Sequence, residues 1–260
     1  MNNGHSEHQV KLQTIDSANR QTVSNDKEHC FDENGHEREG VIKYHLLFSR
    51  QPIASCVSIE PLDMWRHVLF NLELVGQDSA RYGGLGFGNI STRLSLVTSS
   101  ESDGQNSQHE NNSFLISGSQ TGHLPYLQPE DCAVVSHCDA KNNQLVAQGE
   151  CKPSSESLTH GVLYNAIPSV GAVVHVHSPL IWPQADALSL LYTDAHIPYG
   201  TPAMADAVTN VARDIISQSK EPVFVMKGHV DGVVSFGANL ADAVSSLLAV
   251  YHRAILKTVR

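Results

Sequence analysis

The chain has few cysteines, and their spacing fits no common cross-linking or zinc-binding arrangement. They are odd in number and include no Cys-x-x-Cys pair. We therefore expect neither a disulfide framework nor a zinc knuckle. Reduced thiols are expected at all five positions, namely Cys30, Cys56, Cys132, Cys138 and Cys151.

Long apolar runs are also absent. The first residues, MNNGHSEHQVKLQTIDSANR, contain no apolar run of the length found in signal peptides. No later stretch approaches the roughly 20 apolar residues that a membrane-spanning helix needs. We therefore expect a cytoplasmic protein with no membrane partner.

Positive charge is scarce: 17 Lys and Arg residues stand against 27 Asp and Glu residues, which gives a net charge of −10. Nucleic acids and anionic membranes are bound through clustered Lys and Arg, so neither is an expected partner. The chain also lacks Gly-x-Gly-x-x-Gly, Walker and Gly-x-Ser-x-Gly motifs, which leaves nucleotide binding and serine hydrolysis without support. Any anion site must be local.

The remaining composition is that of a folded domain with a polar extension. Hydrophobic residues make up 41% of the 260-residue chain, enough for one packed core. Residues 1–40 carry eight acidic and four basic side chains and show no sustained apolar period. We expect 1–40 to be a disordered acidic tail and 41–260 to be a single domain, with the polar segment 99–113 forming a flexible loop.

Strand and helix patterns alternate within 41–260 and predict a mixed α/β order. Helical spacing predicts helices from Pro61, over 155–167, over 203–217 and after a cap at Asn239. Apolar runs predict strands at 41–48, 90–97, 114–117, 133–138, 144–148, 171–178, 222–227 and 232–236.

Two histidines stand two residues apart in the segment VVHVHSP. Because a strand has a period of two, His175 and His177 share a face and could chelate one ion; the alternative is a hydrogen-bonded pair in the core. His229 lies between two predicted strands, where a short turn could aim its imidazole at the same point. Three neutral imidazoles leave coordination positions open, as in catalytic Zn²⁺ sites. The pattern predicts a site for Zn²⁺ or another divalent ion.

Glu156 begins a predicted helix just before the strand that carries the histidine pair. Its carboxylate could reach the metal as a fourth ligand or carry protons. The alternative is an acidic residue favoured in the first helical turn by the helix dipole and by capping, without any catalysis.

A local anion site is predicted where small and hydroxyl-bearing residues cluster. Ser154 and Ser155 stand at a helix start, where free N–H groups suit a phosphate, although capping explains one serine. The glycine-dense segment YGGLGFGN, at 82–89, either faces a ligand or makes a plain tight turn. Small residues with exposed donors could complete the pocket, namely Gly88, Asn89, Thr121 and Gly122.

Six motifs in order, GNISTR, FLISGSQTG, PEDCAVV, KPSSESLTH, VGAVVHVHSP and KGHVDGVVSFG, resemble the class II aldolase/adducin family, and in particular fuculose-phosphate aldolases. The match runs from about Pro61 to the C-terminus. The resemblance implies a three-layer α/β/α domain around a mostly antiparallel sheet, assembled as a tetramer. It also implies zinc binding at His175, His177 and His229 and acid/base chemistry at Glu156. Phosphate binding is implied at Gly88, Asn89, Thr121, Gly122, Ser154 and Ser155.

The expected function is therefore that of a metal-dependent lyase, which cleaves a ketose or ketose phosphate through a metal-stabilised enediolate. Dehydratase, 4-epimerase and decarboxylase reactions on the same site are alternatives, because all share an enolate. Related epimerases carry Asp where this chain has Glu156, which favours aldolase or dehydratase chemistry. An adducin-like scaffold without activity is the alternative from another class, and retention of all three histidines argues against it. A catalytic tyrosine is not assigned among Tyr126, Tyr192 and Tyr199.

Overall fold

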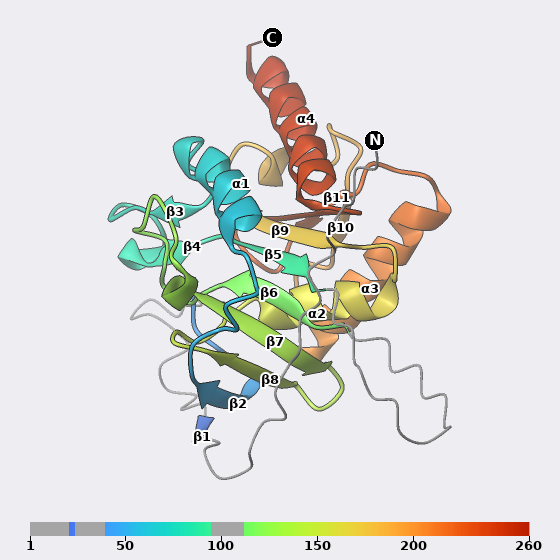
Figure 1. Cartoon of the computed structure of the whole chain (residues 1–260). Helices are drawn as coiled ribbons and strands as arrows, with labels where there is room; N and C mark the ends of the chain where they lie inside the picture. The colour runs from blue at the N-terminus through green and yellow to red at the C-terminus, as the bar shows by residue number, and fades with distance from the viewer. Residues whose placement is uncertain (1–20, 24–39, 95–111, 260) are drawn as a thin grey trace, which may run out of the picture.

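A mixed β-sheet runs through the middle of the domain (Figure 1). The computed structural model describes residues 21–23, 40–94 and 112–259. Within them, ten strands form one sheet in the order β1-β2-β8-β7-β6-β5-β9-β12-β11-β10, and β3 and β4 form a separate pair. The strands are β1 (Gln21–Val23), β2 (His45–Arg50), β3 (Gly76–Gln77), β4 (Gly86–Phe87), β5 (Asn89–Arg93), β6 (Phe114–Ser117), β7 (Cys132–Asp139), β8 (Gln144–Gly149), β9 (Ala172–His177), β10 (Leu191–Thr193), β11 (Val223–Met226) and β12 (Gly232–Gly237).

Helices cover both faces of the sheet. The helices are α1 (Glu60–Asn71), α2 (Ser157–Ala166), α3 (Pro202–Ser217) and α4 (Leu240–Thr258). One hydrophobic core cluster joins α1 and α4 to the sheet, and a second joins α2 and α3 to the opposite face. Strand β9 contributes to both, with Val174 in the first and Val173 in the second, because successive side chains alternate. The prediction of three α/β/α layers is confirmed.

The sheet is mixed, which corrects the expectation of a mostly antiparallel one. The pairings of β2 with β8 and of β10 with β11 are parallel, near the two edges of the sheet. The strands between them pair antiparallel. The parallel pair β10–β11 arises because α3 lies between the two strands in sequence, and such a crossover makes the strands it joins parallel.

Most predicted elements are present, with shifts at their ends. Helix α2 begins at Ser157 with Glu156 as its N-cap, two residues after the predicted start, so Ser155 lies in the turn before the helix. The Asn239 cap is confirmed, because its side chain accepts a hydrogen bond from the backbone N–H of Asp242 at 2.9 Å. Most of the predicted loop 99–113 and of the predicted tail falls outside the described residues; within the tail, β1 pairs antiparallel with β2.

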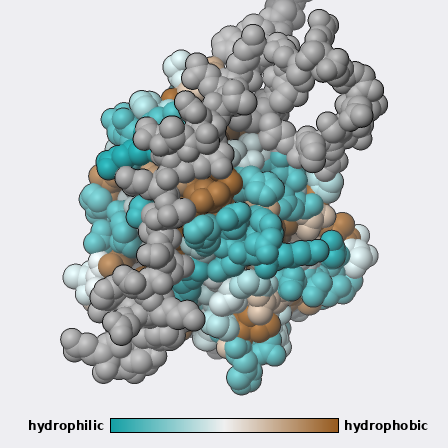
Figure 2. Space-filling model, turned by 90° about the horizontal axis from the view of Figure 1, so that it is seen from below, coloured by the Kyte–Doolittle hydropathy of each residue, from teal (hydrophilic) through white to brown (hydrophobic). Residues whose placement is uncertain are grey.

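The face shown in Figure 2 is largely hydrophilic among the residues that carry a colour. Its hydrophobic residues form separate patches, as expected where most apolar side chains lie in the two core clusters. None of the described helices is long and apolar enough to cross a membrane. The described cysteines are free thiols, namely Cys56, Cys132, Cys138 and Cys151.

Candidate active site

Three histidine side chains meet at one buried point. One ligand atom from each of His175, His177 and His229 lies within 4.8 Å of the others, and the Nε2 atoms of His175 and His177 are 3.2 Å apart. The histidine pair shares a face of β9 because side chains alternate along a strand. His229 is held in the β11–β12 turn, where its N–H donates to the carbonyl of Met226 at 3.0 Å. The expectation that the three imidazoles converge is confirmed.

This donor set fits a divalent metal ion. The residues His175, His177 and His229 are 0%, 0% and 4% exposed. Burial lowers the pKa of His177 well below its usual value, and electrostatic interactions with His229 and Arg81 lower it further. A neutral imidazole offers a lone pair to a metal, and three nitrogen ligands leave a position open for a substrate oxygen.

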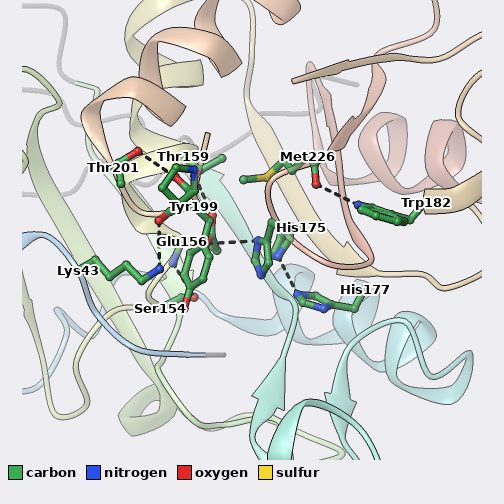
Figure 3. A network of polar contacts seen from close by, with 12 residues as sticks. Lys43, Ser154, Glu156, Thr159, His175, His177, Trp182, Tyr199, Thr201 and Met226 are labelled. Atoms are coloured by element: carbon green, nitrogen blue, oxygen red, sulfur yellow. Dashed lines mark hydrogen bonds and ion pairs between the residues drawn. The ribbon is translucent and has the colours of Figure 1, made fainter. Parts of the chain in front are cut away.

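Glu156 lies beside the histidine group. Its Oε1 is 3.7 Å from Nδ1 of His229, and both side chains are almost fully buried. Its Oε2 accepts a hydrogen bond from the Thr159 hydroxyl at 2.8 Å, which fixes the orientation of the carboxylate. Figure 3 shows Glu156 facing the imidazoles; it is the N-cap of α2, whereas the histidines come from β9 and the β11–β12 turn. Glu156 occupies the N-cap position of α2, but its side chain makes no capping hydrogen bond and faces the histidine group instead. A catalytic role for Glu156 stays a prediction.

The ring of Tyr199 packs on His229, a contact that the sequence did not reveal. The rings of Tyr199 and His229 stack with centroids 4.3 Å apart and an angle of 16° between planes. The ammonium group of Lys43 lies 3.4 Å from the centroid of the Tyr199 ring and donates to the Tyr199 carbonyl at 3.3 Å (Figure 3). Of the three candidate tyrosines, only Tyr199 is buried; Tyr126 and Tyr192 are exposed. Tyr199 is thus the candidate that contacts the histidine group.

The glycine-dense segment holds the strand end that carries His177. The ring of Tyr82 packs edge-on against His177, with centroids 4.6 Å apart, and its hydroxyl donates to Oδ2 of Asp231 at 2.7 Å. The guanidinium of Arg81 donates to the Tyr82 hydroxyl at 2.9 Å and to the His177 carbonyl at 3.4 Å. These contacts join the segment to the β11–β12 turn, since Asp231 follows His229 by two residues. Sequence reasoning missed them because the partners are distant along the chain.

The six residues predicted to hold phosphate line one cavity. Thr121 is among them, so the ISGSQTG loop places it beside the others. Lys152 is not among the lining residues, and none of those residues has a charged side chain. An anion in this cavity would be bound by backbone N–H groups and neutral side chains. The lining residues are Gly88, Asn89, Thr121, Gly122, Ser154 and Ser155, with Gly40, Gly86, Gly118, Ser119 and Gln120.

The cavity adjoins the histidine group through two elements. Asn89 on β5 is the register partner of His175 on β9, and Ser155 immediately precedes Glu156. Gly88 has a φ of +73°, and a Cβ there would lie 2.6 Å from Cγ1 of Val75 and 3.1 Å from the His175 carbonyl oxygen. Only glycine permits this close approach, so Gly88 serves both as a turn and as a wall of the cavity.

His160 stands apart from the histidine group. It is fully buried on α2, where its Nδ1 lies 2.7 Å from the Ser91 hydroxyl. Burial lowers its pKa to about 3. A neutral imidazole in this position belongs to the core beneath the site.

The fold and the buried histidine group agree with a family relationship. The family model of the Class II Aldolase and Adducin N-terminal domain matches residues 78–256. Because this match covers more than half of the chain, the chain belongs to that family. Members of the family use a divalent metal ion, commonly Zn²⁺.

Individual relatives are distant. A methylthioribulose-1-phosphate dehydratase of Pseudomonas syringae pv. syringae (strain B728a) is 28% identical over 162 residues, which cover 52% of this chain and 72% of the relative. The solved structure of an L-fuculose 1-phosphate aldolase is 18% identical, with a TM-score of 0.55 and coverage of 80% of this chain and 87% of the other. A sugar-phosphate aldolase from Thermotoga maritima is 16% identical, with a TM-score of 0.55 and coverage of 76% and 92%. The two structures establish the shared fold.

Proposed function

We propose that this chain is a metal-dependent lyase that cleaves a ketose or ketose phosphate, with its ion held by His175, His177 and His229. The observation that carries the proposal is the convergence of three buried imidazoles beside a buried carboxylate, with Glu156 Oε1 at 3.7 Å from His229 Nδ1. A divalent ion, Zn²⁺ above all, would polarise the carbonyl and hydroxyl oxygens of the substrate and stabilise the negative charge that develops during bond cleavage.

Glu156 acts as the proton carrier in this proposal. In an aldol cleavage, a base removes the proton of the hydroxyl group on the carbon that becomes the aldehyde. The electron pair of the broken carbon–carbon bond remains on the fragment that keeps the carbonyl group, which then accepts a proton. The hydrogen bond from Thr159 holds Oε2, so that Oε1 faces the histidine group.

The cavity beside the histidine group binds the phosphate of a ketose phosphate. Ser155 and Asn89 supply neutral donors, and the glycines permit a close approach to backbone N–H groups. Since no lining side chain is charged, recognition depends on oriented dipoles. This arrangement agrees with a chain of net charge −10 that has no broad basic surface.

Dehydration is the second candidate reaction, favoured by the similarity to a methylthioribulose-1-phosphate dehydratase. In a dehydration, the base removes a proton from the carbon next to the carbonyl group, and a hydroxyl group leaves from the following carbon as water. The same carboxylate can take the first proton and deliver one to the leaving hydroxyl. The two reactions differ in their products, because dehydration keeps the carbon chain intact.

A panel of ketose phosphates and their unphosphorylated analogues tests the proposal, with metal content measured on the same sample. An aldolase gives two carbonyl fragments, and a dehydratase gives one dehydrated product; epimerised sugar or released carbon dioxide identifies the other two reactions. Glu156→Gln should lower turnover by about 10²-fold or more in any of these cases. A metal-loaded protein that leaves the whole panel unchanged would overturn the proposal and support a scaffold role.

We also infer from the family that the chain forms a homo-oligomer, most simply a tetramer. We infer that it acts in the cytoplasm. Sedimentation analysis of the purified chain tests the assembly. A monomer at the concentrations of the assay would contradict it.

A further inference from the structure

A buried guanidinium group lies behind the cavity. Arg66 on α1 is 2% exposed, which is unusual for an arginine. Its Nη2 donates to the Thr121 carbonyl at 2.9 Å, and its Nη1 donates to the Leu124 carbonyl at 2.7 Å. Neither acceptor is a carboxylate; the carbonyl groups of one loop and the nearby charges of Asp63 and Asp131 together stabilise the buried cation. The guanidinium therefore holds that loop in place.

The first of these hydrogen bonds fixes the direction of a peptide group. In a trans peptide, the C=O of one residue and the N–H of the next point in opposite directions. Because the Thr121 carbonyl faces Arg66, the N–H of Gly122 must point away from Arg66. The Gly122 nitrogen is 3.2 Å from the position that a Cβ on Gly86 would take, and Gly86 and Gly122 both line the cavity. The N–H of Gly122 thus lies on the side of the loop that faces away from Arg66, and Gly122 lines the cavity.

The Thr121 side chain does not itself fix the direction of this peptide group. Its hydroxyl donates to the Gly118 carbonyl at 2.9 Å, within the same loop. The backbone N–H of Leu124 also donates to the Thr121 carbonyl, at 3.1 Å, which closes the turn but does not tie it to another element. Arg66 provides that tie, because it stands on α1 and is packed in the domain.

We propose that Arg66 is a positioning residue for the phosphate cavity: by holding the Thr121 and Leu124 carbonyl groups, it directs the N–H of Gly122 at the anion. This inference rests on the proposed phosphate site. It explains how the long ISGSQTG loop keeps Thr121 and Gly122 beside Ser155 without a charged side chain in the cavity.

The test is a titration of the metal-loaded protein with inorganic phosphate, followed by calorimetry. Arg66→Met removes both hydrogen bonds and should raise the dissociation constant for phosphate about tenfold or more. Arg66→Lys keeps the cation but not the paired donors, so it should give a smaller increase of about threefold. Metal content should be unchanged in both variants, because Arg66 contacts none of the three histidines in the described structure.

His67→Ala is the matched control. His67 also stands on α1, and its Nδ1 lies 3.0 Å from the Pro125 carbonyl oxygen, further along the same loop. Its loss removes a contact between α1 and the loop without removing the hydrogen bond to the Thr121 carbonyl, so phosphate affinity should stay within about twofold. If Arg66→Met does not fold, Arg66→Lys and His67→Ala still provide the comparison.

Two results would overturn the inference, and they are distinguishable. If wild type binds phosphate and Ser155→Ala weakens that binding, but the Arg66 variants bind as wild type does, only the role of Arg66 is wrong. If wild type itself binds no phosphate, the phosphate part of the proposed function fails, and the role of Arg66 fails with it.

Discussion

Nδ1 of His229 lies 3.7 Å from Oε1 of Glu156, and the two side chains are 3% and 1% exposed. One residue comes from the β11–β12 turn and the other caps α2, so the contact exists only in the folded domain. The ring of Tyr199 stacks on His229 as well. The arrangement separates two tasks that can be tested independently, namely holding an ion and moving a proton.

Replacement of His177 by Ala should release the bound ion. Wild type should carry about one divalent ion per chain, and the variant should carry close to none, because two imidazoles bind such ions much more weakly than three. Elemental analysis of dialysed protein measures both. His196→Ala is the control, since the His196 side chain is 95% exposed. Equal metal content in wild type and His177→Ala would contradict the assignment.

Exchange of Glu156 for Gln should lower kcat by about 10²-fold or more while metal content is retained, because the amide keeps the size of the side chain but loses the base. Thr159→Val should have a smaller effect, since it removes only the hydrogen bond that orients Oε2. Steady-state kinetics on an identified substrate measures both variants. If Glu156→Gln turns over as fast as wild type, Glu156 is not the base and only occupies the N-cap position of α2.

The sequence allowed the strongest local patterns to be predicted. The helical spacing after Pro61, the cap at Asn239 and the alternation through His175 and His177 all depend on neighbours a few residues away. Each of these predictions agrees with the structure. The convergence of His229 on the pair required the family resemblance as well, because a turn does not by itself say where its side chain points.

Contacts between distant segments were not predictable in this way. The stacking of Tyr199 on His229 and the hydrogen bonds of Arg66 to the Thr121 loop are set by packing, and neither leaves a periodic signal. Strand β10, Leu191–Thr193, was missed because three residues are too few to show alternation. Without β10, neither the crossover through α3 nor the parallel pairing of β10 with β11 could be predicted.

Gly88→Ala should destabilise the protein more than Gly83→Ala does. Both glycines have positive φ, +73° and +67°, so both substitutions carry a backbone cost of about 1–2 kcal/mol. A Cβ at Gly83 meets nothing within 4 Å, whereas one at Gly88 lies 2.6 Å from Cγ1 of Val75. Overpacking should add about 1–3 kcal/mol to the loss at Gly88. Urea unfolding measures the free energy of both; equal losses would show that the wall of the cavity yields easily.

His160 should make the domain sensitive to acid. Its pKa is lowered to about 3 by burial, from 6.5 in the unfolded chain. Between these values the unfolded state binds more protons, so the contribution of His160 to stability is complete above about pH 6.5. It is lost by up to about 1.4 kcal/mol per unit as the pH falls.

His160→Asn removes this titration, so its free energy of unfolding should depend less steeply on pH between about pH 6 and pH 4. A chelator in both samples keeps the contribution of His175, His177 and His229 equal. Parallel curves for wild type and variant would mean that His160 is protonated in the folded protein.

Ser155→Ala should separate a phosphorylated substrate from an unphosphorylated one. Ser155 lines the cavity and stands directly before Glu156, so its hydroxyl can donate to a phosphate held next to the reacting carbons. A hydrogen bond to a charged group contributes about 1.5–3 kcal/mol, so KM for a ketose phosphate should rise about tenfold or more. KM for the unphosphorylated analogue should change little.

The matched control is Ser157→Ala, because the Ser157 hydroxyl donates to the Ser154 carbonyl at 2.7 Å and stabilises the turn rather than lining the cavity. Loss of that bond should affect both substrates alike. An equal rise in KM for the two substrates in Ser155→Ala would point to a different substrate class for the cavity, such as a carboxylate or a bulkier sugar.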